Sequence, residues 1–387
     1  MIRLRKNTLF VVVFVVLALF FIGCEGPAGE DGSDGTNGVD GIAGSDGGNG
    51  TDGADGADGT VTCFQCHATE LFEQARYDFV ESQHSSGDIA VSYAGGRGSC
   101  ASCHSHEGFV AFANGNAGHD IANPSAWECG TCHTLHDSFT SEDYNLRMTT
   151  AASIWDSGTF LLKGESLLAL EGGSALCANC HQSRRGGPTD QGGNMVDLDD
   201  DDIDETEVPS GSFFISSSHY GPHHGAQANV LVGAGFAEVE GPTAYPDANS
   251  SYHIPAGCTG CHMYDNSHSF APDVASCNEC HATTDFNYGG VQDDIEELLE
   301  ELQDLLAAAG AIAESHEVTF EFDPETGDAV EVEPVAGFHP VVGIYPLPVA
   351  QGFFNWTGLE EDRSLGVHNP KYVKALLKNS IKAIEDM

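Results

Sequence analysis

Regular spacing of apolar and polar residues is concentrated in the last third of this 387-residue chain. Residues 293–306 place their apolar side chains on one helical stripe, with acidic residues at the N-terminal end, so the pattern predicts a helix. Residues 317–333 predict a small hairpin, because two alternating segments flank Asp-Pro-Glu-Thr-Gly-Asp. A final helix is predicted at about 370–385, where apolar residues recur at helical spacing and lysines favour the C-terminal side.

The N-terminal segment has the pattern of an export signal. Basic residues precede an apolar run from Leu9 to Ile22, which is too short to span a bilayer comfortably. The sequence Phe-Ile-Gly-Cys that ends at Cys24 resembles a bacterial lipobox, which predicts that residues 1–23 are removed and that Cys24 is lipidated. An ordinary signal peptide that leaves a free thiol at Cys24 is the alternative.

Residues 24–60 are expected to form the lipid anchor and a stalk. From Gly26 to Gly59 every third residue is glycine, which is the collagen period. Proline, which stiffens collagen chains, occurs there only at Pro27, and aspartate fills many other places. The segment therefore predicts either a flexible acidic stalk or a collagen-like trimer.

One pattern, Cys-x-x-Cys-His, occurs six times and is numbered here as motifs 1 to 6 in chain order. The cysteines are Cys63, Cys66, Cys100, Cys103, Cys129, Cys132, Cys177, Cys180, Cys258, Cys261, Cys277 and Cys280, and the histidines are His67, His104, His133, His181, His262 and His281. Two thiols at this spacing attach one haem through thioether bonds, and the adjacent histidine becomes the proximal iron ligand. Zinc sites do not require a histidine after every second cysteine. The sequence therefore predicts six haem c groups.

The motifs lie in a region, residues 61–285, without sustained strand alternation or repeated helical pattern. Six large apolar haems replace much of the aliphatic core that a chain of this size otherwise needs. We therefore expect a haem-templated multihaem cytochrome c fold, mainly α and irregular coil with little β and a C-terminal pair of helices. Residues 286–387 are expected to form a C-terminal helical region that supplies at least one distal ligand.

Twelve histidines lie outside the motifs, twice the number needed to give every iron a second axial ligand. Several stand in distinctive phrases, among them Ser-Gln-His84-Ser, Gly-Pro-His-His224-Gly and Gly-Val-His368-Asn-Pro. In these phrases the chain resembles the exported multihaem c-type cytochromes of metal- and sulfur-respiring bacteria. It is more distantly similar to the pentahaem nitrite reductase and octahaem hydroxylamine oxidoreductase group. The resemblance implies that the distal ligands include His84, His224, His253, His268 and His368.

The sixth distal ligand is less directly indicated. His136 follows motif 3 as Cys-His-Thr-Leu-His, a spacing in which the second histidine often serves a neighbouring haem, so it is the first choice. His106 and His119 are the reserves, and His316 and His339 are not expected to bind iron.

The formal charge of −45, from 59 acidic and 14 basic residues, excludes nucleic acid and anionic membrane surfaces as partners. It is compatible with cationic redox proteins, divalent metal ions and positively charged mineral surfaces. The acidic run 197–207 begins like a calcium-binding EF-hand loop, but its sixth and twelfth positions are Asp202 and Val208 instead of glycine and glutamate. An exposed acidic loop is therefore favoured over a calcium site.

These patterns favour an electron-transfer protein without catalytic residues. Iron with two histidine ligands has no open position, so electrons would pass at or outside the outer membrane toward an extracellular metal or mineral acceptor or a redox partner protein. The expected location is that of an outer membrane lipoprotein, at the cell surface or facing the periplasm. A multihaem reductase of nitrogen or sulfur oxyanions with one open haem, and a subunit of an extracellular cytochrome filament, are the alternatives.

Overall fold

The computed structural model describes residues 67, 69–87, 90–136, 144–150, 170–198, 205–223, 225–322 and 329–387, with backbone alone for residues 315–322 and 329–336. The predicted signal segment, Cys24, the stalk, and Cys63 and Cys66 of motif 1 lie outside these ranges. His224 and residues 199–204 of the acidic run also lie outside them. Within the described residues, no helix is both long enough and apolar enough to cross a bilayer.

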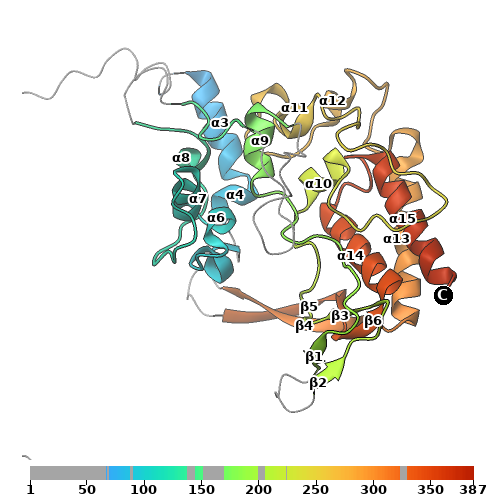
Figure 1. Ribbon diagram of the computed structural model, residues 1–387. Coiled ribbons are helices and arrows are strands. Elements are labelled where there is room, and N and C mark those ends of the chain that lie inside the picture. The colour runs from blue at the N-terminus through green and yellow to red at the C-terminus, as the bar shows by residue number, and fades with distance from the viewer. Residues whose placement is uncertain are drawn as a thin grey trace, which may run out of the picture. The chain divides into compact units, whose positions relative to one another are not determined.

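The part of the chain that carries the motifs consists of short helices joined by turns (Figure 1). The first, α3 (Glu70–Val80), begins where the Thr69 hydroxyl accepts a hydrogen bond from the Phe72 N–H at 3.2 Å. The others are α4 (Gln83–Ser86), η2 (Val91–Gly95), α6 (Ala101–His104), α7 (His106–Ala113), α8 (Cys129–Cys132), α9 (Gly172–Ala178), α10 (Gln227–Val232), α11 (Gly257–His262), η3 (Tyr264–Asn266), α12 (Val274–Cys277) and η4 (Tyr288–Gly290).

Three longer helices, α13 (Val291–Ala308), α14 (Leu347–Asp362) and α15 (Pro370–Glu385), pack against one another near the C-terminus (Figure 1). They hold the main apolar cluster of the described chain. One face of α13 is buried through Ile295, Leu299, Leu302 and Leu306, which belong to the predicted stripe. Their burial removes apolar surface from water, at about 25 cal/mol for each Å².

Two buried asparagines fasten a loop to these helices. The side-chain amide of Asn355 accepts a hydrogen bond from the Ala237 N–H at 2.9 Å and donates to the Ala237 carbonyl at 2.8 Å. Asn379 makes the same pair of bonds with Thr243, at 3.0 and 2.8 Å. Side chains therefore satisfy the backbone N–H and carbonyl groups of Ala237 and Thr243, which have no strand partner.

The described strands form antiparallel pairs. They are β1 (Met195–Asp197) with β2 (Glu205–Glu207), β3 (Ser212–Ile215) with β6 (Gly343–Pro346), and β4 (Ile312–Phe322) with β5 (Ala329–Pro340). The predicted helices at 293–306 and 370–385 and the predicted hairpin at 317–333 are confirmed by α13, α15 and the β4–β5 pair. Helix α14 and the β3–β6 pair were not predicted.

Candidate haem centres

The fully described motifs form turns of helix that end at the motif histidine. In motif 4 the His181 N–H donates to the carbonyl of Cys177 at 3.0 Å. The equivalent bonds, from His104 to Cys100, His133 to Cys129 and His281 to Cys277, measure 3.2, 3.0 and 2.8 Å. Residues four apart share a helix face, so the first thiol and the imidazole point to the same side. This is the arrangement that one covalently attached haem requires.

Every motif histidine lies beside a different histidine from outside the motifs. The pairs, with the distances between ring centres, are His67 and His136 at 5.9 Å, His104 and His223 at 5.9 Å, His133 and His268 at 6.5 Å, His181 and His84 at 6.0 Å, His262 and His368 at 6.3 Å, and His281 and His253 at 6.3 Å. Five of the six histidines predicted as distal ligands are in this set. The partners come from distant parts of the sequence, so the fold and not the local spacing brings them together.

These separations match two imidazoles on opposite sides of one iron. With metal–nitrogen bonds of about 2 Å and about 1.2 Å from each nitrogen to its ring centre, the two centres lie about 6.4 Å apart. Direct contact between the rings would not require nearly the same distance between ring centres in all six pairs. Within the described residues, no three His, Cys, Asp or Glu side chains gather as a closed metal site would require. The pairs therefore fit haem iron and do not fit structural zinc.

Hydrogen bonds to Nδ1 orient several of these rings. His133, His262, His268 and His253 have Nδ1 next to a backbone carbonyl, at 2.6, 2.8, 2.9 and 2.8 Å. An Nδ1–H that donates to a carbonyl fixes the tautomer and leaves the Nε2 lone pair for a metal. Sequence spacing gives no sign of these carbonyl partners, which come from Tyr144, Phe270, Asn266 and Val367.

Burial favours the neutral form, which a metal ligand needs, in four of these rings. It lowers the pKa of His84 to about 4, with a further contribution from the charge of His181. Burial also lowers the pKa of His181, His133 and His262. His368 differs, because burial lowers its pKa but the neighbouring Asp362 carboxylate outweighs that effect and raises it.

The structure distinguishes ligand candidates from other histidines. His106, one of the two reserves, has Nδ1 2.8 Å from the Thr131 hydroxyl and Nε2 3.4 Å from a carboxylate oxygen of Glu128. Both of its ring nitrogens therefore already face protein groups. Beside His104 the structure places His223, which was not predicted, whereas the predicted His224 lies outside the described residues.

Backbone geometry also marks two of the partner histidines. His136 and His223 have φ values of 56° and 80°, in the left-handed region that residues with a Cβ seldom adopt. Such strain persists where surrounding structure enforces it, commonly at functional sites. Both residues hold a ring at the iron-spanning distance from a motif histidine.

Neighbouring motifs touch through their cysteine-bearing turns. The Cys103 sulfur lies 3.7 Å from the Asn179 carbonyl oxygen, and the Cys180 sulfur lies 4.0 Å from the Ser102 carbonyl oxygen, so motifs 2 and 4 are in contact. The Cys258 sulfur of motif 5 lies 3.9 Å from the carbonyl oxygen of Ser174, on the helix that leads into motif 4. The Phe270 ring lies beside both His84 and His268, with ring centres 4.9 and 6.1 Å apart, and so joins the ring pairs of motifs 4 and 3. Motif 4 is therefore adjacent to motifs 2 and 5 and shares Phe270 with the ring pair of motif 3.

Close approach of motifs 4 and 5 depends on small residues. A Cβ at Gly257 would lie 2.4 Å from the Ser174 hydroxyl oxygen, and one at Gly173 would lie 2.8 Å from a methyl group of Thr259. The same Ser174 hydroxyl accepts hydrogen bonds from the N–H groups of Cys258 and Thr259, at 3.0 and 3.3 Å. These contacts set the distance between the two sites.

A cavity of about 800 Å³ opens beside His67 along α3. Its lining includes Tyr77 and Val80, whose side chains are large, apolar and mostly exposed, and Arg76. The lining also includes Glu70 and Glu73, and a carboxylate oxygen of Glu73 lies 3.9 Å from Arg76. The apolar part of the lining, next to His67, suits the flat apolar face of a haem held by motif 1.

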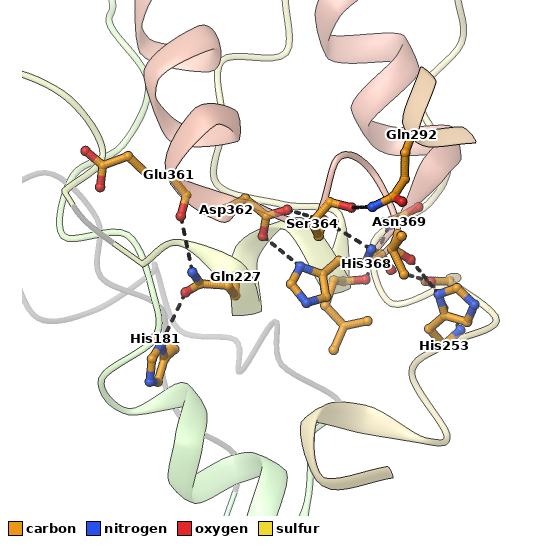
Figure 2. A network of polar contacts seen from close by, with 12 residues as sticks. His181, Gln227, His253, Gln292, Glu361, Asp362, Ser364, His368 and Asn369 are labelled. Carbon is orange, nitrogen blue, oxygen red and sulfur yellow. Dashed lines mark hydrogen bonds and ion pairs between the residues drawn. The ribbon is translucent and has the colours of Figure 1, made fainter. Parts of the chain in front are cut away.

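The C-terminal end of α14 and the segment that joins it to α15 contact histidine rings from the pairs of three motifs (Figure 2). Gln227 accepts from Nδ1 of His181 at 3.2 Å and donates to the Glu361 carbonyl at 3.4 Å. Asp362 accepts from Nδ1 of His368 at 2.7 Å, and the next turn brings the Val367 carbonyl to His253. The packed C-terminal helices therefore orient rings of motifs 4, 5 and 6.

Comparison with known proteins also indicates haem, as the ring pairs do. The chain is 26% identical, over 362 aligned residues, to the C-type polyheme cytochrome OmcB from two strains of Geobacter sulfurreducens. The alignment covers 76% of this chain and 45% of OmcB, so the chain spans less than half the length of these relatives. No family model and no solved structure matches the chain.

The chain is thus distantly similar to a polyhaem c-type cytochrome. The similarity supports a multihaem cytochrome, with haem c as the implied cofactor. The motif cysteines and histidines are the residues that would hold it. Haem supplies a one-electron iron centre, and this chain supplies the attachment, the axial rings and the surroundings of each iron.

Proposed function

We propose that this protein is an electron carrier with six haem c groups, each with two histidine ligands, in a mainly α and coil fold organised by the haems. The proposal rests on the six histidine ring pairs, one for each motif, whose ring centres lie 5.9 to 6.5 Å apart. In each pair the motif histidine is the proximal ligand and its neighbour the distal one. We assign His223 as a distal ligand, whereas the resemblance had implied His224.

Paired ligands favour electron transfer over the reductase alternative. A reductase that acts on a nitrogen or sulfur oxyanion needs an iron with an exchangeable position. Here a second imidazole stands opposite each motif histidine. The role of the chain's residues is then to hold iron in a fixed geometry, so that adding or removing one electron causes little rearrangement.

Contacts between motifs support a connected route for electrons. The cysteine-bearing turn of motif 4 contacts those of motifs 2 and 5, and Phe270 lies between the ring pairs of motifs 4 and 3. Motif 6 follows motif 5 closely, because the Asp273 N–H at the start of α12 donates to the Cys261 carbonyl at 3.3 Å. Motif 1 shares its ring pair with His136, which follows motif 3 directly. In this proposal the haem of motif 4 is a junction between the routes toward motifs 2, 1 and 6.

The proposal extends to location and partners. Cys24 carries the lipid, residues 24–60 hold the haem region away from an outer membrane, and the acceptor is a metal ion, a mineral surface or a redox protein outside that membrane. The lipobox-like sequence and the charge of −45 support this part. Mass analysis of the mature N-terminus tests it: a diacylated Cys24 is the expected result, and an unmodified N-terminus would refute the anchor.

Spectroscopy of the purified ferric protein tests the central proposal. The pyridine haemochrome assay and intact mass should give six haems for each chain, and electron paramagnetic resonance should give only low-spin ferric signals. A high-spin fraction in the intact protein that binds nitrite, hydroxylamine or cyanide would contradict the closed coordination. A haem count below six would contradict the assignment of all motifs.

A further inference from the structure

The ring of His368 differs from the other paired rings whose Nδ1 partner is described. His133, His253, His262 and His268 face backbone carbonyls, and His181 faces the amide of Gln227. His368 alone in this group faces a carboxylate, with Nδ1 2.7 Å from an oxygen of Asp362 (Figure 2).

The position of Asp362 is unfavourable for an acid unless it has a compensating interaction. Its side chain is 1% exposed, and it is the last residue of α14, where the helix dipole repels negative charge. The Ser364 hydroxyl donates to its second carboxylate oxygen, and the His368 ring faces the first. The negative charge of Asp362 is therefore directed at the His368 ring.

We propose that Asp362 lowers the reduction potential of the motif 5 haem by acting through His368, an inference that rests on the proposed function. A carboxylate that accepts the Nδ1–H of an iron-bound imidazole makes the ring a stronger electron donor. The added electron density stabilises ferric over ferrous iron. Reduction adds one electron to the iron, supplied by a neighbouring haem or by the chemical reductant, and the Nδ1 proton stays between His368 and Asp362.

The neighbouring motif 4 has a neutral Nδ1 partner, and this difference from motif 5 predicts the direction of electron flow between the two haems. His181 of motif 4 faces the neutral Gln227, which the same segment holds through the Glu361 carbonyl. Motifs 4 and 5 are in contact, because Ser174, on the helix that leads into motif 4, accepts a hydrogen bond from the Cys258 N–H at 3.0 Å. A lower potential at motif 5 favours electron flow from motif 5 to motif 4, so Asp362 sets a downhill step within the chain.

The test is a potentiometric titration of the full-length holoprotein, followed by low-temperature electron paramagnetic resonance of the low-spin ferric signals. In Asp362→Asn the amide oxygen still accepts the Nδ1–H but the charge is gone. One of the six signals should then disappear at a higher potential, with the others nearly unchanged. The reciprocal variant Gln227→Glu places a carboxylate on His181 and should lower the potential of a different signal.

Two further variants make the outcome decisive. Ser364→Ala removes a donor to Asp362, leaves the carboxylate free to bind His368 more strongly, and should shift the same signal in the direction opposite to Asp362→Asn. Asp362→Glu keeps the charge and should restore most of the original potential. Unchanged potentials in Asp362→Asn, with six low-spin signals retained, would overturn the inference.

Other results are also interpretable. If Asp362→Asn loses a haem or a low-spin signal, the sign of the shift in Ser364→Ala decides the question. If the unsubstituted protein holds fewer than six low-spin haems, the proposed function fails before any variant is compared.

Discussion

Replacing His84 by alanine should open one iron and leave the other five closed. The His84 ring is centred 6.0 Å from that of His181 and packs edge-on against the rings of Trp127 and Phe270, at 5.5 and 4.9 Å. Each motif histidine has its own partner, so removal of one distal ring should expose only the haem of motif 4. One of the six haems should therefore lose its distal ligand.

The surroundings of His84 also indicate how the variant can be rescued. Removing the ring leaves a space walled by Trp127 and Phe270 that the backbone does not fill. Engineered apolar cavities of this kind bind small ring compounds. Added imidazole should therefore enter the space, bind the motif 4 iron and restore the low-spin state.

The assay is electron paramagnetic resonance of the ferric protein, with cyanide binding as a second measure. About one sixth of the iron should become high-spin, bind cyanide and revert on addition of imidazole. His106→Ala is the matched control, because His106 has both ring nitrogens facing protein groups and should leave all six signals low-spin.

Two results would refute the pairing. One is a His84→Ala protein with six unchanged low-spin signals, which would show that another residue is the ligand of motif 4. The other is a high-spin signal in His106→Ala.

Three further experiments test other parts of the structure. His223→Ala should produce one high-spin haem and His224→Ala none, and the reverse result in the same spectra would show that the neighbouring ring is the ligand. Asn355→Leu should lower the melting temperature of the C-terminal helices, followed by circular dichroism, because two backbone groups of Ala237 lose their partners at about 1–3 kcal/mol each. The control Asn116→Leu, at an exposed site, should show almost no change in the same measurement. In protein produced without haem attachment, hydrogen exchange should show protection of α13, α14 and α15 but little in the motif region, and equal protection of both would contradict a haem-dependent fold.

Features set by local spacing could be read from the sequence. The motif turns follow from two cysteines and a histidine within five residues, and α13 follows from the periodic burial of Ile295, Leu299, Leu302 and Leu306. The N-cap Asn369 and Pro370 mark the start of α15 in the same way. Each of these signals lies within a single helix or turn, so no knowledge of the rest of the fold is needed.

Features that depend on distant segments were missed. Helix α14 is buried over most of its surface, including Phe353, Phe354 and Asn355, so it has no polar face to give a periodic signal. The His223 ring beside His104 belongs to a residue with a left-handed backbone, a conformation that the neighbouring residue types do not predict. Asp362 also gave no signal, since its role depends on a turn that brings it to His368.

The ring pairs give the chain an interleaved set of links. Those from His67 to His136, His84 to His181, His104 to His223 and His133 to His268 each begin before the previous one closes. In the chain-entropy model, one link across about 100 residues removes several kcal/mol of disorder from the unfolded state. Because the loops overlap, the proposed coordination would keep both fragments bound through iron after a protease cuts one connecting segment. The nicked protein should keep its colour and its size until the axial ligands are displaced.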